Sequence, residues 1–419
     1  MKKFIYIILL TLIAEGAVAQ LSLTGEVRPR AEFRNGFKKL NSAATDPALF
    51  IEQRSRLYIN FKQEKFDFQI TMQDIRLWGE NAQIYKADNG MFNIYEAYGS
   101  YKIDDVWSVK VGRQALNYDN ARFLGNLDWA QQGRSHDAFL LRYESDFTFH
   151  LGAAFNQEDV VSKVEPARLA STYYATGGNY KTMQYLWMNQ KYDAGNTSLL
   201  VLNNGVQMAD STVNFGQTFG LFSQNNLGGL NLVAEAYYQM GKDGADKNIN
   251  AYMFALNGTV KIGKGNIGLG GELLSGTNAG DTDNNAFNPL YGTNHKFYGL
   301  MDYFYVGNPH GNVGLTDIYL KGVIPTGDRS KLIAHAHYFM SAADFNNLDG
   351  SSADKYLGSE LDLIWNINLQ KDVNLKIGYS HMLASESMEI LKGGDNNELN
   401  NWAWVMISFK PELFNSATN

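Results

Sequence analysis

Apolar and polar residues alternate with a period of two in many segments of this 419-residue chain, and this alternation limits the possible folds more than any other feature. In residues 361–370, Leu361, Leu363 and Trp365 share one face of an extended strand, while mostly polar residues share the other. Residues 65–73 repeat the pattern. Few segments show the period of 3.6 that is typical of an amphipathic helix. We therefore predict an all-β protein.

Three further features favour one large barrel over a soluble sandwich, which shows the same alternation. Tyrosine and tryptophan recur near predicted strand ends, as expected for interfacial girdles; examples are Tyr101, Trp187, Tyr192, Tyr238, Trp402 and Trp404. About 18 strands fit the chain, a number that leaves an aqueous channel in a closed barrel. Short connections, expected on the periplasmic side, alternate with long ones, expected outside the cell. The long ones are 35–49, 78–90, 117–135, 158–179, 277–311 and 344–355.

The first 19 residues have the pattern of a secretory signal peptide. Lys2 and Lys3 precede an apolar stretch, and Ala17-Val18-Ala19 fits a small-residue cleavage site. We therefore expect residues 20–419 to form the mature barrel, exported to the outer membrane of a Gram-negative bacterium. The chain has no cysteine, and the mature part has 34 basic against 42 acidic residues. This acidic balance argues against nucleic-acid binding.

Charged residues identify the inward face of the first two strands. In the segment EVRPRAEFR, Glu26, Arg28 and Arg30 alternate with apolar residues, and Arg54 and Arg56 do the same in the next strand. A charge facing lipid costs about 2–4 kcal/mol at the bilayer midplane, so these side chains are expected to face the lumen. Ten of the 12 arginines lie between residues 28 and 142, although residues 20–150 contain 17 acidic against 17 basic residues.

The stretch GRQALNYDNARFLGNLDWAQQGRSHDAFLLRY, residues 112–143, carries much of this charge. It resembles the signature of the bacterial alginate-export family of outer-membrane porins, and the segments VRPRAEFR, IEQRSRLYINF and NIYEAYGSYK extend the resemblance. The resemblance implies a monomeric 18-stranded barrel in lipid, with an arginine-rich constriction for anionic small solutes or an acidic polysaccharide such as alginate. The implied solute-binding residues are Arg28, Arg30, Arg54, Arg56, Arg113, Gln114, Arg122, Asp128, Trp129, Gln132, Arg134 and Asp137.

Other functions find less support in the residues. No nucleophile elbow, phosphate loop or dinucleotide fingerprint is present, so we expect neither an enzyme nor a cofactor. His335 and His337 share a strand face, but no third ligand lies at a useful spacing, so no metal site is expected. Ion pairs among the arginines and acids are equally compatible with a structural role. The alternative class is a secreted soluble β-sandwich that binds or hydrolyses carbohydrate.

Overall fold

The computed structural model describes residues 19–80, 92–157, 180–304 and 312–417. The regular secondary structure of the described residues is almost entirely β-strand, as the alternation predicts. Its elements in chain order are β1 (Gln20–Asn35), β2 (Ala48–Lys62), β3 (Phe66–Leu77), β4 (Asn93–Lys102), β5 (Trp107–Gln114), β6 (His136–Glu144), β7 (Phe147–Phe155), β8 (Thr182–Tyr192), β9 (Gly195–Gln207), β10 (Val213–Leu227), β11 (Leu230–Lys242), β12 (Asn248–Ile262), β13 (Gly265–Leu274), η2 (Asn294–Lys296), β14 (Leu315–Gly327), β15 (Ser330–Met340), β16 (Tyr356–Gln370), β17 (Val373–Ala384), α2 (Glu386–Lys392), β18 (Asn400–Phe409) and β19 (Glu412–Asn415).

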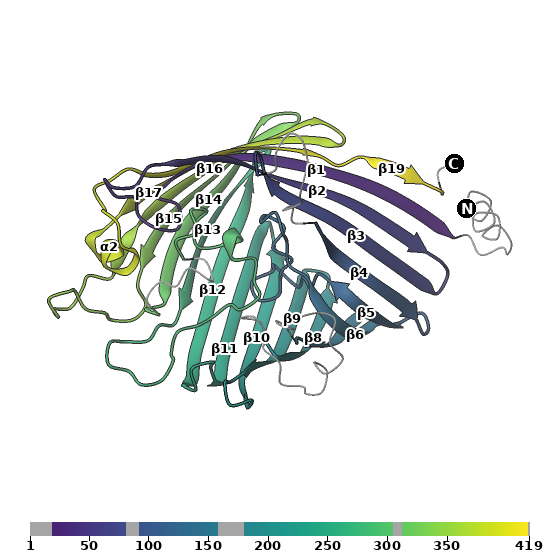
Figure 1. Cartoon of the computed structure of the whole chain (residues 1–419), viewed down its shortest axis with the longest axis horizontal. Coiled ribbons are helices and arrows are strands. Elements are labelled where there is room, and N and C mark those ends of the chain that lie inside the picture. Colours follow the sequence, from purple (N-terminus) through teal and green to yellow (C-terminus); the bar gives the residue numbers. More distant parts are fainter. Residues whose placement is uncertain (1–18, 81–91, 158–179, 305–311, 418–419) are drawn as a thin grey trace.

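The strands form one closed antiparallel barrel (Figure 1). Each strand pairs with the next along the chain, and β1 closes the ring by pairing with β2 on one side and with β18 and β19 on the other. Pro411 separates β18 from β19, because proline has no N–H to donate to the ladder. The described residues therefore form 18 strand positions, which confirms the predicted barrel and excludes the sandwich.

Connection lengths alternate around the barrel, as predicted. Short turns such as residues 228–229 and 371–372 lie at the end that also carries both chain termini (Figure 1). The longest described connections, 115–135 and 275–314, leave the opposite end, and the second of these contains η2 and an undescribed portion. The predicted signal peptide and the predicted long connection at 158–179 lie outside the described residues, apart from Ala19.

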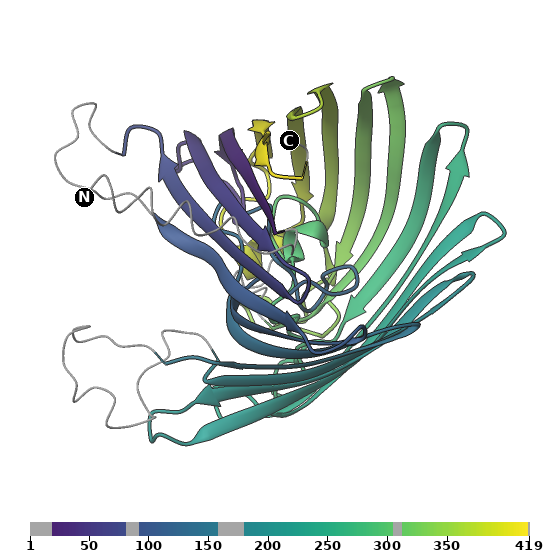
Figure 2. The ribbon, with the colours of Figure 1, turned by 90° about the vertical axis from the view of Figure 1, so that its right-hand side faces the viewer.

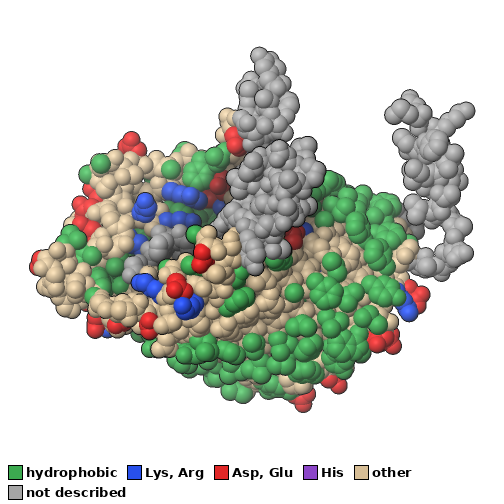
Figure 3. All heavy atoms as spheres, turned by 60° about the horizontal axis from the view of Figure 1, so that its bottom comes forward, with side chains coloured by type: hydrophobic (Ala, Val, Ile, Leu, Met, Phe, Trp, Pro, Cys, Tyr) green, Lys and Arg blue, Asp and Glu red, His purple; other side chains and the backbone are tan. Residues whose placement is uncertain are grey.

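The outer wall is apolar and the charged ladders face inward. Val27 and Phe33 of β1 are exposed on the outer face, whereas Arg28 and Glu32 between them are buried. Hydrophobic side chains cover a broad part of the outer wall, and acidic groups lie at its margins (Figure 3). An apolar outer face is what lipid tails require of a barrel, and the burial of the charges confirms the orientation expected for β1 and β2.

The prediction of an interfacial girdle was wrong for three of the tryptophans. Tyr101, Tyr192 and Tyr238 are exposed on the barrel wall, but Trp402 and Trp404 of β18 are buried in the interior. Trp187 also points inward, since its indole N–H donates to the carboxylate of Asp119 in the connection 115–135, at 3.1 Å. The reason is a packing partner that no local pattern reveals. The inward tryptophans contact connections that enter the barrel.

Connection 115–135 and the described part of the second connection, residues 275–304, enter the ring of strands and lie near its centre (Figure 2). Phe123 and Leu124 of the first connection pack with Phe297 and Met301 of the second in a buried apolar cluster. These connections therefore narrow the lumen from within. No helix in the described part of the chain is long and apolar enough to cross a bilayer.

Candidate functional site

The connection 115–135 is bound to the arginines of β1 and β2. The main-chain carbonyl of Asp128 accepts hydrogen bonds from Arg28, at 2.9 Å, and from Arg54, at 3.2 Å. A buried carbonyl without a donor is unfavourable, so these guanidinium groups stabilise a loop whose backbone has left the sheet. The two neighbouring strands thus hold the tip of the connection inside the barrel.

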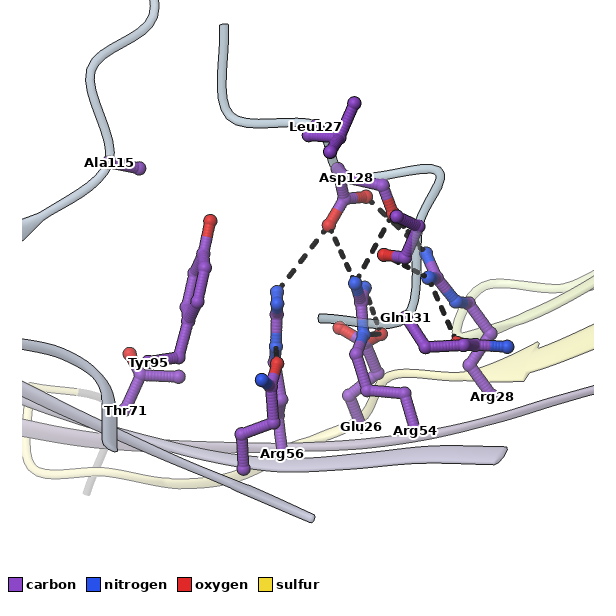
Figure 4. Close-up of polar contacts among 12 residues, drawn as sticks. Glu26, Arg28, Arg54, Arg56, Thr71, Tyr95, Ala115, Leu127, Asp128 and Gln131 are labelled. Carbon is purple, nitrogen blue, oxygen red and sulfur yellow. Dashed lines mark hydrogen bonds and ion pairs between the residues drawn. The ribbon is translucent and has the colours of Figure 1, made fainter. Parts of the chain in front are cut away.

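The side chain of Asp128 lies above three guanidinium groups (Figure 4). One carboxylate oxygen is 3.0 Å from Nη1 of Arg54 and 3.4 Å from Nη1 of Arg56, and the other is 3.5 Å from Arg28. The Asp128 side chain is 54% exposed, whereas those of the arginines are at most 7% exposed. We call these four residues the arginine cluster. Burial alone raises the pKa of Asp128, but Arg54, Arg28 and Arg56 outweigh it and lower the pKa below its ordinary value.

Side chains of β1, β3 and β4 orient the guanidinium groups of Arg54 and Arg56. Nε of Arg54 donates to Glu26 at 2.8 Å, and Nη2 of the same group donates to the same oxygen at 2.5 Å. Arg56 donates to Gln73 at 2.7 Å and lies over the ring of Tyr95, 3.7 Å from its centroid. These contacts fix the planes of both forks, so their remaining N–H groups point toward the connection.

A glycine allows the connection to close over Arg56. Gly133 has a φ of +67°, and a Cβ at this position would lie 2.7 Å from Tyr95 and 2.8 Å from Nη2 of Arg56. The preceding carbonyl, that of Gln132, accepts hydrogen bonds from Arg56 at 3.2 Å and from Gln73 at 3.0 Å. Gln132 therefore joins the site through its main chain, whereas the prediction assigned it a solute-binding role.

Trp129, in the connection 115–135, packs between the second entering connection and the barrel wall. Its carbonyl accepts a hydrogen bond from Arg30 at 2.9 Å, and the same guanidinium lies 4.3 Å from the centroid of its ring. The indole stacks on His295 at 4.6 Å and meets Trp404 edge-on at 4.8 Å. Arg30 is also paired with Glu32 at 2.6 Å. These contacts enclose both predicted site residues and give them a structural role.

Arg122 joins the connection to the opposite wall. It pairs with Glu235 of β11 at 3.3 Å and with Glu272 of β13 at 2.6 Å, and it lies over the ring of Phe297 at 3.5 Å. Burial alone lowers the pKa of Arg122, but Glu235 and Glu272 outweigh it and raise the pKa well above its ordinary value. Arg122 is therefore a permanently charged anchor and lies away from the arginine cluster.

Three predicted site residues on β5 and β6 do not join the cluster. Arg113 and Asp137 pair with each other at 3.3 Å and share the exposed wall face with Phe139. Gln114 points the other way, but it is fully buried and donates to the carbonyl of Ala138 at 3.0 Å. The structure therefore does not bring these three residues together with the arginine cluster. Because successive side chains of a strand point to opposite faces, Arg113 of β5 points outward and Gln114 points inward, where it is buried.

Arg134 reaches the second entering connection, where it donates to the carbonyl of Gly292 at 2.9 Å. The partners that hold these loops, notably Glu235, Glu272 and His295, were not among the predicted site residues. Alternation could have placed the two glutamates on the inward faces of their strands. No local pattern pairs them with Arg122, more than 100 residues earlier in the chain.

A polar cavity of about 430 Å³ lies toward the end with the short turns. Gln69, Tyr98, Lys110 and Arg142 contribute to its lining, and the ammonium group of Lys110 lies 3.6 Å from the ring centroid of Tyr98. Cationic groups thus continue along the inner wall beyond the arginine cluster.

Comparison with known proteins identifies the family. Among solved structures, OccAB4 of Acinetobacter baumannii is similar with a TM-score of 0.65 and 12% identity, over 95% of this chain and 99% of that one. A BenF-like porin of Pseudomonas fluorescens has a TM-score of 0.63 and 13% identity over 94% and 99%. OpdK of Pseudomonas aeruginosa, also solved with vanillate, has a TM-score of 0.61 and 9% identity over 93% and 98%. A search of curated proteins found no match.

At these identities the solved structures establish the fold of an outer-membrane porin. The sequence family described as "Alginate export" matches residues 19–390, which is most of the chain. This match confirms the resemblance stated from the sequence. The chain belongs to the alginate export family and folds as an 18-stranded barrel of the outer-membrane porin type.

Proposed function

We propose that the protein is a passive, non-enzymatic channel of the Gram-negative outer membrane for anionic solutes, and that the arginine cluster is the part of its constriction that attracts them. One observation carries the proposal. Three buried guanidinium groups converge on Asp128, whose carboxylate is half exposed inside the barrel. An incoming carboxylate or uronate can approach these guanidinium groups from the side on which Asp128 is exposed.

The charges of the cluster favour brief binding. Arg28, Arg54 and Arg56 carry three positive charges, against which Glu26 and Asp128 carry two negative ones. A guanidinium fork matches a carboxylate in shape and charge, so anions are favoured. Glu26 and Asp128 weaken the attraction between the arginines and an anion. A channel needs such weak binding, because the solute must also leave.

The solute class is proposed from chemistry and family together. The family description makes alginate, an acidic polysaccharide, the first solute to test. From residue 152 onward the chain has 25 acidic against 17 basic residues, so the positive region is confined to the first part of the barrel wall. Small carboxylates are therefore the second class to test. We further propose that one chain forms the channel, since a single chain closes the barrel.

The experiment compares an arginine inside the barrel with one outside it. Purified protein is inserted into planar bilayers, and the reversal potential is measured across a KCl gradient for wild type, Arg56→Gln and Arg113→Gln. Removal of a charge about 4 Å from a passing ion in water costs about 1 kcal/mol, so Arg56→Gln should lower the anion-to-cation permeability ratio roughly fivefold. Arg113→Gln, on the outer face, should leave the ratio unchanged. An unchanged ratio in Arg56→Gln would refute the proposal.

Block by the solutes themselves provides the second measurement. Oligomers of alginate and small carboxylates such as vanillate are added to the open wild-type channel, and interruptions of the current are counted. Alginate oligomers should interrupt the current, and Arg56→Gln should shorten the interruptions. Absence of block by every carboxylate tested would contradict the proposed solute class while leaving a channel in place.

A further inference from the structure

Two histidines and an aspartate converge on the inner wall, away from the arginine cluster. His335 and His337 share the inward face of β15, opposite the exposed Tyr338. Asp362 of β16 lies directly across from His335 in the strand pairing. One potential ligand atom from each of His335, His337 and Asp362 lies within 4.8 Å of the others. The neighbouring strand thus supplies the third ligand that the spacing along β15 lacks.

Asp317 of β14 orients one of the two histidines. Nδ1 of His337 is 2.9 Å and 3.0 Å from the two carboxylate oxygens of Asp317. When Asp317 is ionised it only accepts hydrogen bonds, and in that state Nδ1 of His337 carries the proton and Nε2 presents its lone pair. A carboxylate that fixes the tautomer of a histidine ligand in this way is a recurrent feature of metal sites.

Asp362 is buried with one oxygen aimed at the same place. Its Oδ1 accepts a hydrogen bond from Ser380 at 2.5 Å. Its Oδ2 is buried without a hydrogen-bond donor among the described residues and lies 3.9 Å from Nε2 of His337. That separation is too long for a hydrogen bond. It is close to the spacing of about 3.4 Å that tetrahedral ligands adopt around an ion with bonds of about 2.0–2.1 Å.

The surroundings are rich in buried acids. Glu360 lies opposite His337 in the pairing, and one of its carboxylate oxygens also lacks a donor among the described residues. Lys321 of β14, opposite His335, is a cation on the same wall, and its ammonium group lies 4.1 Å from the ring centroid of Tyr319. A buried carboxylate oxygen without a donor calls for a counter-group, and a bound cation is one such group.

We propose that His335, His337 and Asp362 bind a divalent transition-metal cation of the zinc type, with one coordination position left open toward the lumen. Two imidazoles and one carboxylate are a ligand set that suits such ions, and three protein ligands leave room for a water molecule or a solute. His335 is less buried than His337, and its ring nitrogens make no hydrogen bond with the residues that the structure describes, so they are available to a cation.

The test measures zinc binding to the full chain, without an affinity tag, in detergent. Equilibrium dialysis followed by elemental analysis should give one zinc per barrel, and cobalt should give the visible absorption of a low-symmetry site. Asp362→Asn and His335→Gln should each weaken zinc binding at least tenfold. His150→Gln, which changes a histidine paired with Glu144 elsewhere on the wall, should bind zinc as wild type does. Heat-modifiable migration on a gel checks that each variant is folded.

Two further variants change residues that are not proposed ligands. One tests the orientation of His337 by Asp317, and the other tests the effect of the Lys321 charge. Asp317→Asn should weaken zinc binding about 10- to 100-fold, the usual effect of removing the group that orients a histidine ligand. Lys321→Met should tighten it, because a competing positive charge is removed. Absence of zinc and cobalt binding by the wild type would overturn the proposal, as would wild-type affinity in both folded Asp362→Asn and folded His335→Gln. Channel selectivity does not enter these measurements, so the result is independent of the proposed transport function.

Discussion

The carboxylate of Asp128 lies 3.0 Å from Nη1 of Arg54, although 74 residues separate the two along the chain. This pair joins a loop to the barrel wall and places a negative charge where three positive charges meet. Arg54 is at the same time bound to Glu26 on β1. One guanidinium therefore both holds the loop and contributes to the field that a passing anion encounters.

Asp128→Asn should increase the preference of the channel for anions. The substitution changes only the side chain, and the main-chain carbonyl of residue 128 still accepts hydrogen bonds from Arg28 and Arg54. The loop should therefore stay in place. Loss of one negative charge about 4 Å from the ion path is worth about 1 kcal/mol in water, or roughly fivefold in permeability ratio. Reversal potentials in a salt gradient measure the change. A ratio that falls or stays constant would show that the ion path does not pass this carboxylate.

Acid should remove the stabilising contribution of the Asp128 charge only at low pH. Because the pKa of Asp128 is lowered in the folded protein, its stabilising contribution is fully present above the unfolded pKa of about 3.9 and is lost as pH falls through the lower folded pKa. The free energy of unfolding is compared for wild type and Asp128→Asn between pH 7 and pH 2. The difference should be constant near neutrality and shrink below about pH 4. A difference that already shrinks near pH 6 would contradict the lowered pKa.

Arg122→Met should destabilise the barrel strongly. Glu235 and Glu272 would remain buried without their cation, and loss of one partner of a buried ion pair costs about 3–5 kcal/mol. Denaturant unfolding of the refolded protein measures the loss. The triple variant that also carries Glu235→Gln and Glu272→Gln should recover part of it, because the unpaired charges are gone. Equal stability of the single and triple variants would rule out this explanation.

Gly133→Ala should displace the loop and enlarge the channel. The new methyl group would meet Tyr95 and Arg56, and alanine tolerates the φ of +67° poorly. We expect a larger single-channel conductance and a stability loss of about 1–3 kcal/mol. Gly228→Ala is the matched control, since its φ is +61° with no described atom within 4 Å of the new carbon. Equal conductance changes in the two variants would assign the effect to backbone strain alone.

Local alternation along the chain was sufficient to predict the strands and their two faces, whereas the barrel also required the strand number, the connection lengths and the aromatic residues near strand ends. A period of two is a property of each strand by itself, so the inward positions of Glu26, Arg28 and Arg54 follow from their neighbours. The same rule places Arg113 with Val109 and Val111 on the outer face, where the structure has it. The family resemblance suggested the lumen for Arg113, and there the local pattern was the better guide.

The sequence by itself thus determined the strands, their two faces and the enrichment of arginine in the first part of the wall. Only the tertiary structure decided that residues 115–135 and 275–304 turn inward, that Asp128 closes over the arginines, and that Asp362 lies beside His335. The physical reason is the range of the interactions. Strand patterns are set by immediate neighbours, whereas a loop position depends on charge pairs and packing between residues that meet only after the barrel has closed.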